Sequence, residues 1–146
     1  DEVELAVAAA DVQCHIQTEQ LGTGHAVSQA LPHCHPASQV LVLFGDVPLI
    51  QSESLAQLIQ ASNNGLGLLS VSLDNPEGYG RIVRDSMGCF AEIVEDRDCS
   101  DAQKQLTEVN TGILMGPAKQ LSTLLSQGAM IMLRVNSIYP MRCGSR

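Results

Sequence analysis

Basic side chains are scarce in this sequence: eight Lys and Arg stand against sixteen Asp and Glu, for a net charge of −8. A nucleic-acid-binding surface needs clustered positive charge, so we expect no nucleic-acid partner. Long apolar runs are also missing, since none approaches the roughly 20 residues that a membrane span requires. No signal-peptide pattern opens the chain. These absences predict a cytoplasmic protein with no membrane partner.

The five cysteines are an odd number, and no two of them form a Cys-x-x-Cys pair. That usage suits a reducing compartment, where free thiols are mostly small buried apolar groups. Cys14, His15 and the segment His33–His35 could be combined into a zinc site, but zinc needs about four convergent ligands and neither cluster has regular site spacing. The favoured interpretation is a strand residue and a polar loop that ends at Pro36; a metal role is the alternative.

What is present is an alternation of two patterns in a chain of 146 residues, of which 45% are hydrophobic and 16% charged. One ordinary domain of ~100–200 residues fits this length. The alternation predicts an α/β fold with a mostly parallel sheet and helices on both faces. We expect strands at Val12–Gln17, Val40–Phe44, Leu66–Leu73 and Val109–Met115, a hairpin of Tyr79–Arg84 with Cys89–Glu95, and helices at His25–Leu31 (capped by Thr23), Ser52–Ala61, Asp101–Leu106 and Ala118–Leu125.

Ligands of open α/β sheets bind beyond the carboxyl ends of the strands, and polar or glycine-containing motifs occupy such positions here. Gly22 and Gly24 stand between an expected strand and a helix, where glycine lets the backbone approach a ligand closely. From these residues alone a plain tight turn is the favoured interpretation, because Gly-x-Gly falls short of a dinucleotide fingerprint, and a ligand-binding loop is the alternative. Asp46 follows an apolar strand, where a carboxylate can hold Mg²⁺ or can simply begin a loop.

Acidic and amide side chains also stand beside the later strands. Glu95 and Asn110 could pair with sugar hydroxyls, because a carboxylate accepts hydrogen bonds and an amide both donates and accepts them. Taken singly, each is better interpreted as a solvated strand end. The short segment 78–82, GYGRI, adds two glycines to this group.

In their order along the chain, the motifs are much more specific than any one alone. They are QLGTGHA at 20–26, FGDVPL at 44–49, GYGRI at 78–82, IVE at 93–95 and NTGIL at 110–114. From about Val12 to Gln127 the chain closely resembles the uridylyltransferase domain of bacterial bifunctional N-acetylglucosamine-1-phosphate uridylyltransferase/glucosamine-1-phosphate acetyltransferases. The resemblance implies a Rossmann-like nucleotidyltransferase fold and Mg²⁺-dependent synthesis of UDP-N-acetylglucosamine from UTP and N-acetylglucosamine 1-phosphate.

The resemblance also implies a role for each matched residue. The chemistry would be an in-line attack of the sugar phosphate on the α-phosphorus of the nucleotide, driven by positioning and charge neutralisation. Carried over by match, the uracil would contact Gln17, Gly22 and Thr23; the nucleotide would lie at Phe44 and Gly45 beside the Mg²⁺ ligand Asp46; and the amino sugar would lie against Gly80, Glu95 and Asn110.

Departures from the family pattern qualify that expectation. Family members begin with a strand and a glycine-rich loop followed by a phosphate-binding Lys, and this chain starts after them. A second metal-ligating Asn and the acetyltransferase domain are also missing. We therefore expect residues 1–128 to form a partial nucleotidyltransferase domain that binds UTP or nucleotide-sugar with impaired catalysis. The alternative is a non-catalytic oligomeric α/β protein with an unrelated binding or structural role.

The tail, residues 129–146, diverges from the family. Synonymous codons exist for it that, read two bases later, encode a family-like continuation, which suggests a frameshift. Its apolar and β-branched residues 130–139 could form a replacement strand against the same domain. Because unpaired strand edges and apolar faces invite a second chain, we expect a homo-oligomer, and a dimer in particular.

Overall fold

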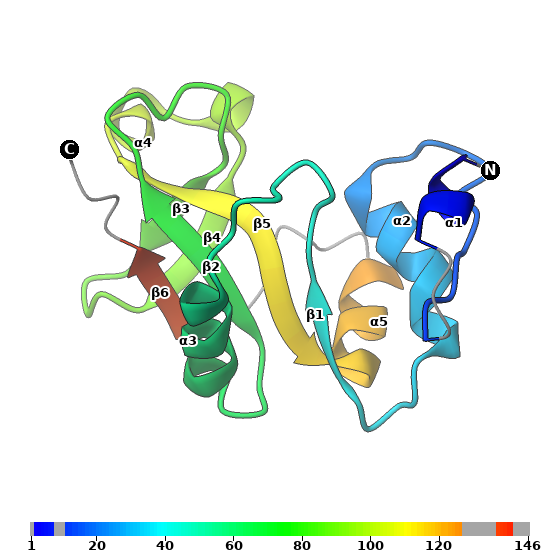
Figure 1. Ribbon diagram of the computed structural model, residues 1–146. Helices are drawn as coiled ribbons and strands as arrows, with labels where there is room; N and C mark the ends of the chain where they lie inside the picture. Colours follow the sequence, from blue (N-terminus) through cyan, green and yellow to red (C-terminus); the bar gives the residue numbers. More distant parts are fainter. Residues whose placement is uncertain (1, 8–10, 127–136, 142–146) are drawn as a thin grey trace.

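The computed structural model of the chain describes residues 2–7, 11–126 and 137–141 (Figure 1). The described helices and strands alternate along most of the chain, as an α/β protein requires. In chain order they are α1 (Glu2–Ala6), α2 (Thr23–Ala30), the 3₁₀ helix η1 (Leu31–His33), β1 (Gln39–Val42), α3 (Ser52–Ser62), β2 (Gly67–Ser72), β3 (Arg81–Arg84), β4 (Phe90–Val94), the 3₁₀ helix η2 (Asp96–Asp98), α4 (Asp101–Lys104), β5 (Glu108–Pro117), α5 (Ala118–Ser126) and β6 (Ser137–Met141).

The strands form a single mixed sheet in the order β4-β3-β5-β2-β6, with β1 paired to β5. Met115 of β5 pairs with both Leu41 of β1 and Gly67 of β2, so β5 lies between these two strands and runs antiparallel to both. The expected α/β class is confirmed, but the described sheet is not mostly parallel. The connection from β2 to β5 carries the β3–β4 hairpin instead of one crossover helix, so β5 enters the sheet in the opposite direction.

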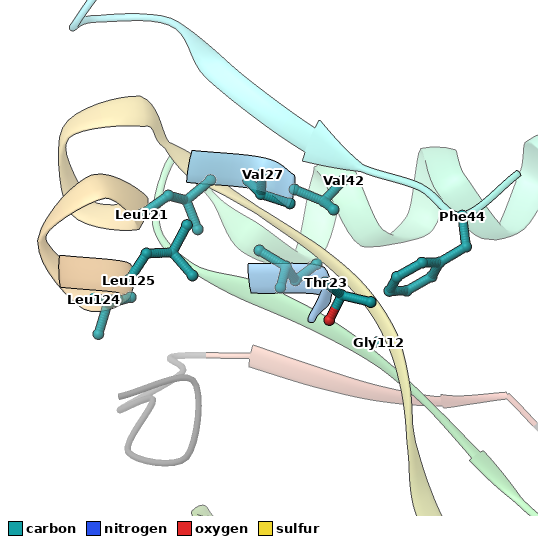
Figure 2. Close-up of a pocket in the computed structure, with 9 residues that line it drawn as sticks. Thr23, Val27, Val42, Phe44, Gly112, Leu121, Leu124 and Leu125 are labelled. Atoms are coloured by element: carbon teal, nitrogen blue, oxygen red, sulfur yellow. The ribbon is translucent and has the colours of Figure 1, made fainter. Parts of the chain in front are cut away.

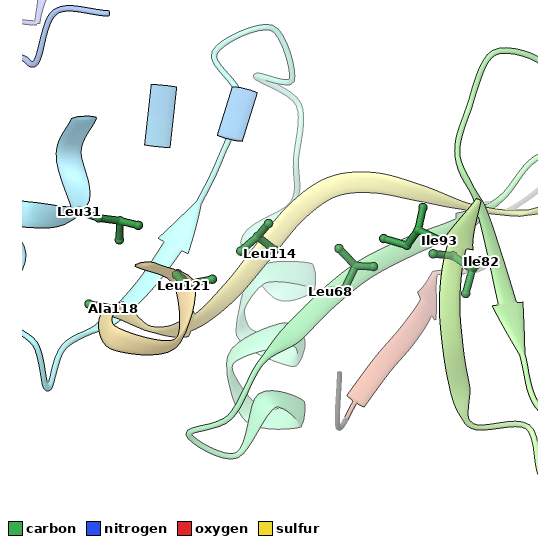
Figure 3. Close-up of a cluster of buried hydrophobic side chains, with 7 residues drawn as sticks. All are labelled: Leu31, Leu68, Ile82, Ile93, Leu114, Ala118 and Leu121. Carbon is green, nitrogen blue, oxygen red and sulfur yellow. The ribbon is translucent and has the colours of Figure 1, made fainter. Parts of the chain in front are cut away.

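Apolar side chains alternate between the two faces of the sheet, so each face has its own core. Leu68 and Leu114 belong to a cluster with Leu31 and Leu121, on the side covered by α2, η1 and α5 (Figure 3). Their chain neighbours point to the opposite face, where Leu69, Ile113 and Met115 pack with Leu58 of α3. Because successive strand residues face opposite sides, both faces of the central strands are buried, and the expected helices on both faces are confirmed.

Two local expectations were wrong. Residues 12–17 form no strand, and Ile16 is 80% exposed, because no described strand pairs with this segment and an extended chain needs a ladder partner. Thr23 does not cap α2: it is the first helical residue, and Gly22 occupies the cap position with φ +98°. The other expected strands and helices are present, although β1 ends at Val42 and α4 ends at Lys104.

Part of the C-terminal tail belongs to the described sheet. Residues 137–141 form β6, which pairs with β2 in parallel along the edge of the sheet. The rest of the tail, which includes most of the suggested frameshift region, lies outside the described residues. None of the described helices has the length and apolar character needed to cross a membrane.

Candidate functional site

One wall of the candidate site is the beginning of α2. The Gln17 side-chain amide donates to the carbonyl of Gly22 at 3.0 Å and lies 3.0 Å from Nδ1 of His25. Gln17 therefore ties the preceding segment to the first turn of the helix. No side chain of the described residues caps this helix and its first turn carries no acidic residue, so the positive end of the helix dipole faces outward at Gly22 and Thr23.

The opposite wall brings three of the predicted residues together. The backbone of Gly80 is buried, and a Cβ at this position would lie 2.9 Å from Cγ2 of Ile93 and 3.6 Å from Oε1 of Glu95. The glycine thus lets the Glu95 carboxylate lie close to the backbone. The backbone N–H of Asn110 donates to the carbonyl of Gly80 at 2.8 Å. Gly80, Glu95 and Asn110 are therefore neighbours, although they come from three separate segments.

A tight contact near the middle of β5 adjoins Asn110. Gly112 has φ +78°, and its backbone lies against the ring of Phe44. The Gly112 N–H donates to Oδ1 of Asn110 at 2.8 Å, so the Asn110 amide oxygen is engaged inside the protein. The NH₂ group of Asn110 makes no hydrogen bond within the described part of the chain. Figure 2 shows Thr23 of α2 beside Phe44 and Gly112.

Between the walls lies an open cleft of ≈ 950 Å³. Ligand sites commonly measure about 300–1,000 Å³, so this volume suits a ligand of nucleotide-sugar size. Gln17 does not line the cleft but holds Gly22 and His25, which do. Gly80 and Asn110 do not line it either: Gly80 lies against Glu95, which does, and Asn110 is hydrogen-bonded to Gly80. The lining residues include the cap residue Gly22 with Thr23, His25 and Ser28 of α2, and Gly78, Glu95, Asp96 and Arg97 from the opposite wall.

A small apolar cavity adjoins the cleft and shares Thr23 and Leu125 with it (Figure 2). Its volume is ≈ 20 Å³, and it lies where α2 and α5 meet β1 and β5. The lining is almost wholly apolar, so the cavity is a packing defect rather than a polar subsite. Its other lining residues are Val27, Val42, Phe44, Gly112, Leu114, Leu121 and Leu124.

Asp46 stands apart from the rest of the predicted site. It lies with Gly45 on the exposed turn after β1, which is closed by a bond from the Val47 N–H to the Phe44 carbonyl at 3.2 Å. Its carboxylate has no partner among the described residues and does not line the cleft. Mg²⁺ is often held by one or two carboxylates plus substrate phosphates, so Asp46 fits a single ligand position. The described residues supply no cluster of three potential ligands.

The two histidine-containing segments do come together, as a pair of stacked rings. The rings of His15 and His33 stack with their centroids 4.1 Å apart and an interplanar angle of 24°. Stacked rings do not direct their nitrogens toward one shared ion, and no group of three metal-binding side chains occurs among the described residues. The structure gives no support to the zinc alternative.

The structure adds three site residues that sequence reasoning left without a role. His25 lines the cleft next to Gln17, Arg97 lines it from the other side, and Arg81 lies buried behind that wall. His25 belongs to the motif QLGTGHA and Arg81 to the motif GYGRI, so the sequence already placed both residues near the expected site. Their contacts depend on residues distant in the sequence, such as the ion pair of Arg81 with Asp96 across the hairpin, and no local pattern reports these.

The sequence profile of the MobA-like NTP transferase domain matches residues 1–108. The chain belongs to this family. It is 53% identical over 126 residues to the bifunctional protein GlmU of Burkholderia vietnamiensis and 51% identical over 127 residues to that of Paraburkholderia phymatum. Each match covers 86% of this chain and 28% of the relative, so the chain spans about a quarter of the length of these proteins. The resemblance to the bifunctional transferases is confirmed.

A solved structure supports the same fold. A crystal structure described as a glucose-1-phosphate thymidylyltransferase from Bacillus anthracis matches with a TM-score of 0.55. The match covers 84% of this chain and 53% of that one, at 15% sequence identity. At this identity the likeness establishes the architecture alone. It agrees with the nucleotidyltransferase-like α/β fold that the motifs predicted.

Proposed function

We propose that the cleft binds a uridine nucleotide or nucleotide-sugar, as in the synthesis of UDP-N-acetylglucosamine from UTP and N-acetylglucosamine 1-phosphate. The observation that carries this proposal is the placement of Gly22 and Thr23 across the cleft from Glu95. The uracil would lie against the glycine-containing start of α2, where exposed backbone donors and acceptors read a base without side-chain bulk. The relatives' similarity over 126 residues supports this choice of ligand.

The amino sugar would lie against the opposite wall. The Glu95 carboxylate, which lines the cleft, would accept hydrogen bonds from sugar hydroxyls. The NH₂ group of Asn110, which lies outside the cleft lining, would donate to a sugar that reaches past Glu95 and Gly80. This differs from the expectation that the Asn110 amide offers both a donor and an acceptor to the sugar, because Gly112 already engages its oxygen. Binding of the sugar would then depend on one strong acceptor and one donor.

The charge of the phosphates would be balanced only weakly by the described residues. Arg97 is the one Lys or Arg among the described side chains that line the cleft, and helix α2 adds its dipole. A bound Mg²⁺ would supply further charge neutralisation; Asp46 does not line the cleft, so its exposed carboxylate would hold the ion together with phosphate oxygens that extend out of the cleft. Transfer at the α-phosphorus relies on several such groups acting together. We therefore propose that the chain binds its ligands but turns them over slowly or not at all.

Isothermal titration of the 146-residue chain with UDP-N-acetylglucosamine and with UTP, each with and without Mg²⁺, tests the proposal. We expect saturable binding, and Glu95→Gln should weaken binding of the nucleotide-sugar. Glu92→Gln is the matched control, because Glu92 is exposed on β4 and does not line the cleft. Asp46→Ala should abolish any Mg²⁺ effect. Absence of binding to both ligands would reject the proposal, and rapid pyrophosphate release would reject impaired catalysis.

A second candidate function is a non-catalytic role in a homo-oligomer. It is favoured by large apolar side chains that remain exposed, among them Ile16, Leu21 and Leu49 at 80%, 68% and 84%. In addition, β1 has one neighbour, β5, among the described strands. Exposed apolar groups and an open strand edge favour association with a second chain. We propose a dimer as the assembled state.

A further inference from the structure

Arg81 is a charged residue buried behind the cleft wall that carries Glu95. Only 2% of the residue is exposed. Its Nη2 lies 2.9 Å from Oδ1 of Asp96, and its Nη1 donates to the carbonyl of Tyr79. Its Nε is buried and has no hydrogen-bond partner in the described structure. A buried guanidinium with one unpaired donor contributes little to folding stability, because its remaining hydrogen bonds and ion pair offset only part of the cost of desolvating the charge.

The two partners of Arg81 belong to the two segments that form this wall. Asp96 begins η2 and lines the cleft between Glu95 and Arg97. Tyr79 follows Gly78, which also lines the cleft, and its N–H closes a turn onto the carbonyl of Pro76 at 3.2 Å. One guanidinium thus connects the turn before β3 to the turn after β4.

The position of Arg81 in the sheet makes this connection rigid. Arg81 pairs with Val94 of β4 and with Val109 of β5, so strands flank it on both sides. Val94 immediately precedes Glu95, whose carbonyl accepts from the Asp98 N–H at 2.8 Å. A side chain that holds Asp96 therefore fixes the backbone at Glu95 as well. It also fixes Gly80, its own neighbour, against the Glu95 carboxylate.

We propose that Arg81 and Asp96 form a positioning pair, which sets the Glu95 carboxylate at the distance from Gly80 that sugar recognition requires. Neither residue needs to touch the ligand for this role. The inference rests on the proposed function, and it makes a more specific claim: the pair determines how strongly the chain prefers a nucleotide-sugar over the same nucleotide without its sugar. Among the described residues no hydrogen bond or ion pair joins Arg81 or Asp96 to α2, so binding of the uracil there should be independent of the pair.

Titration with UDP-N-acetylglucosamine and with UDP, combined with thermal unfolding, tests the pair. In Arg81→Met, affinity for the nucleotide-sugar should fall about tenfold, the usual effect of losing one well-placed polar contact, while affinity for UDP stays within about twofold. Asp96→Asn should shift the affinity ratio in the same direction, and Arg81→Lys should restore part of it. The ratio is the decisive quantity, because a general loss of stability would not change it.

Arg84→Met is the matched control. Arg84 lies on the same strand and has its own ion pair, with Glu108 at 2.7 Å, but it does not line the cleft. The Arg84→Met substitution should lower the unfolding temperature without changing the ratio of the affinities for UDP-N-acetylglucosamine and UDP. If Arg81→Met does not fold, Asp96→Asn carries the same prediction, since the Asp96 side chain is 31% exposed. An unchanged ratio in a folded variant of the pair would overturn the inference alone. A wild-type chain that binds neither ligand would reject the proposed function, and the inference with it.

Discussion

The ring of Phe44 occupies the space that a side chain at Gly112 would need. A Cβ on Gly112 would lie 2.5 Å from Cε2 of the ring, closer than real Cβ atoms approach their neighbours. Phe44 follows β1 and Gly112 lies within β5, so the contact joins the nucleotide side of the predicted site to the segment that carries Asn110. Glycine is required here for space as well as for its φ of +78°.

The substitution Gly112→Ala should therefore destabilise the chain more than an ordinary glycine substitution at positive φ. The left-handed backbone costs an L-residue about 1–2 kcal/mol, and overpacking against Phe44 adds about 1–3 kcal/mol. Gly88→Ala is the matched control, because Gly88 has φ +79° and no atom within 4 Å of its Cβ position. Denaturant unfolding of both variants gives the comparison. Equal losses would show that the Phe44 ring moves aside without cost.

The apolar cavity beside Thr23 offers a stabilising substitution. Val42→Ile adds one methylene next to a void of ≈ 20 Å³, and burial of a methylene contributes about 0.8 kcal/mol. We expect the free energy of unfolding to rise by up to that amount. Val12→Ile is the control, since Val12 is 49% exposed and lies outside the cavity. A lower unfolding temperature for Val42→Ile would mean that the added group meets its neighbours instead of filling the void.

Glu108 should make stability depend on pH. Burial by itself raises the pKa of Glu108, but hydrogen bonds from Arg84 and Ser70, together with the charge of Arg84, outweigh burial and leave the pKa lowered. A carboxyl group with a lowered folded-state pKa stabilises the protein above its unfolded pKa, about 4.3 for Glu. That contribution is lost as the pH falls from there through the folded-state pKa.

Glu108→Gln should accordingly flatten the decline in unfolding free energy as the pH falls below about 4.3. Above that pH the variant should be less stable than the wild type, because Arg84 loses its charged partner. Glu92→Gln, at an exposed position on the neighbouring hairpin, controls for the loss of one carboxylate. Urea titrations at several pH values measure the slope. Parallel curves for wild type and Glu108→Gln would contradict the assignment.

The sequence was sufficient to predict features that depend on local pattern. Leu55 and Leu58, at helical spacing, mark the buried side of α3, and the apolar run that includes Leu41 and Val42 marks β1. The resemblance to a known family then assigned Gly80, Glu95 and Asn110 to one pocket wall, and the structure brings these three together. Residues far apart in the sequence could be grouped only because the family's motifs grouped them.

Features that depend on long-range partners could not be predicted. Alternating apolar residues show that β5 is a strand but not its direction, which is set by the β3–β4 hairpin before it. The segment 12–17 has a strand-like pattern, yet no described strand pairs with it. Arg81 has the sequence character of an exposed residue, and only the fold places Asp96 beside it. Asp46 was assigned to the site from its neighbours in the motif, and it lies on an exposed turn.

The proposed dimer can be tested at the exposed apolar residues near the N-terminal side of the fold. If a second chain covers these residues, replacing them by charged residues should weaken the dimer without disturbing the core. Ile16 and Leu21 suit this test, because they are 80% and 68% exposed and lie outside both buried clusters. The double variant Ile16→Glu/Leu21→Glu should shift the molar mass in light scattering from dimer toward monomer, with an unchanged unfolding temperature at high dilution.

Met87→Glu, at an 83% exposed position on the hairpin loop, is the matched control and should remain dimeric. A wild-type chain that is monomeric across the accessible concentration range would rule out the dimer, and a variant as dimeric as the wild type would place the interface elsewhere.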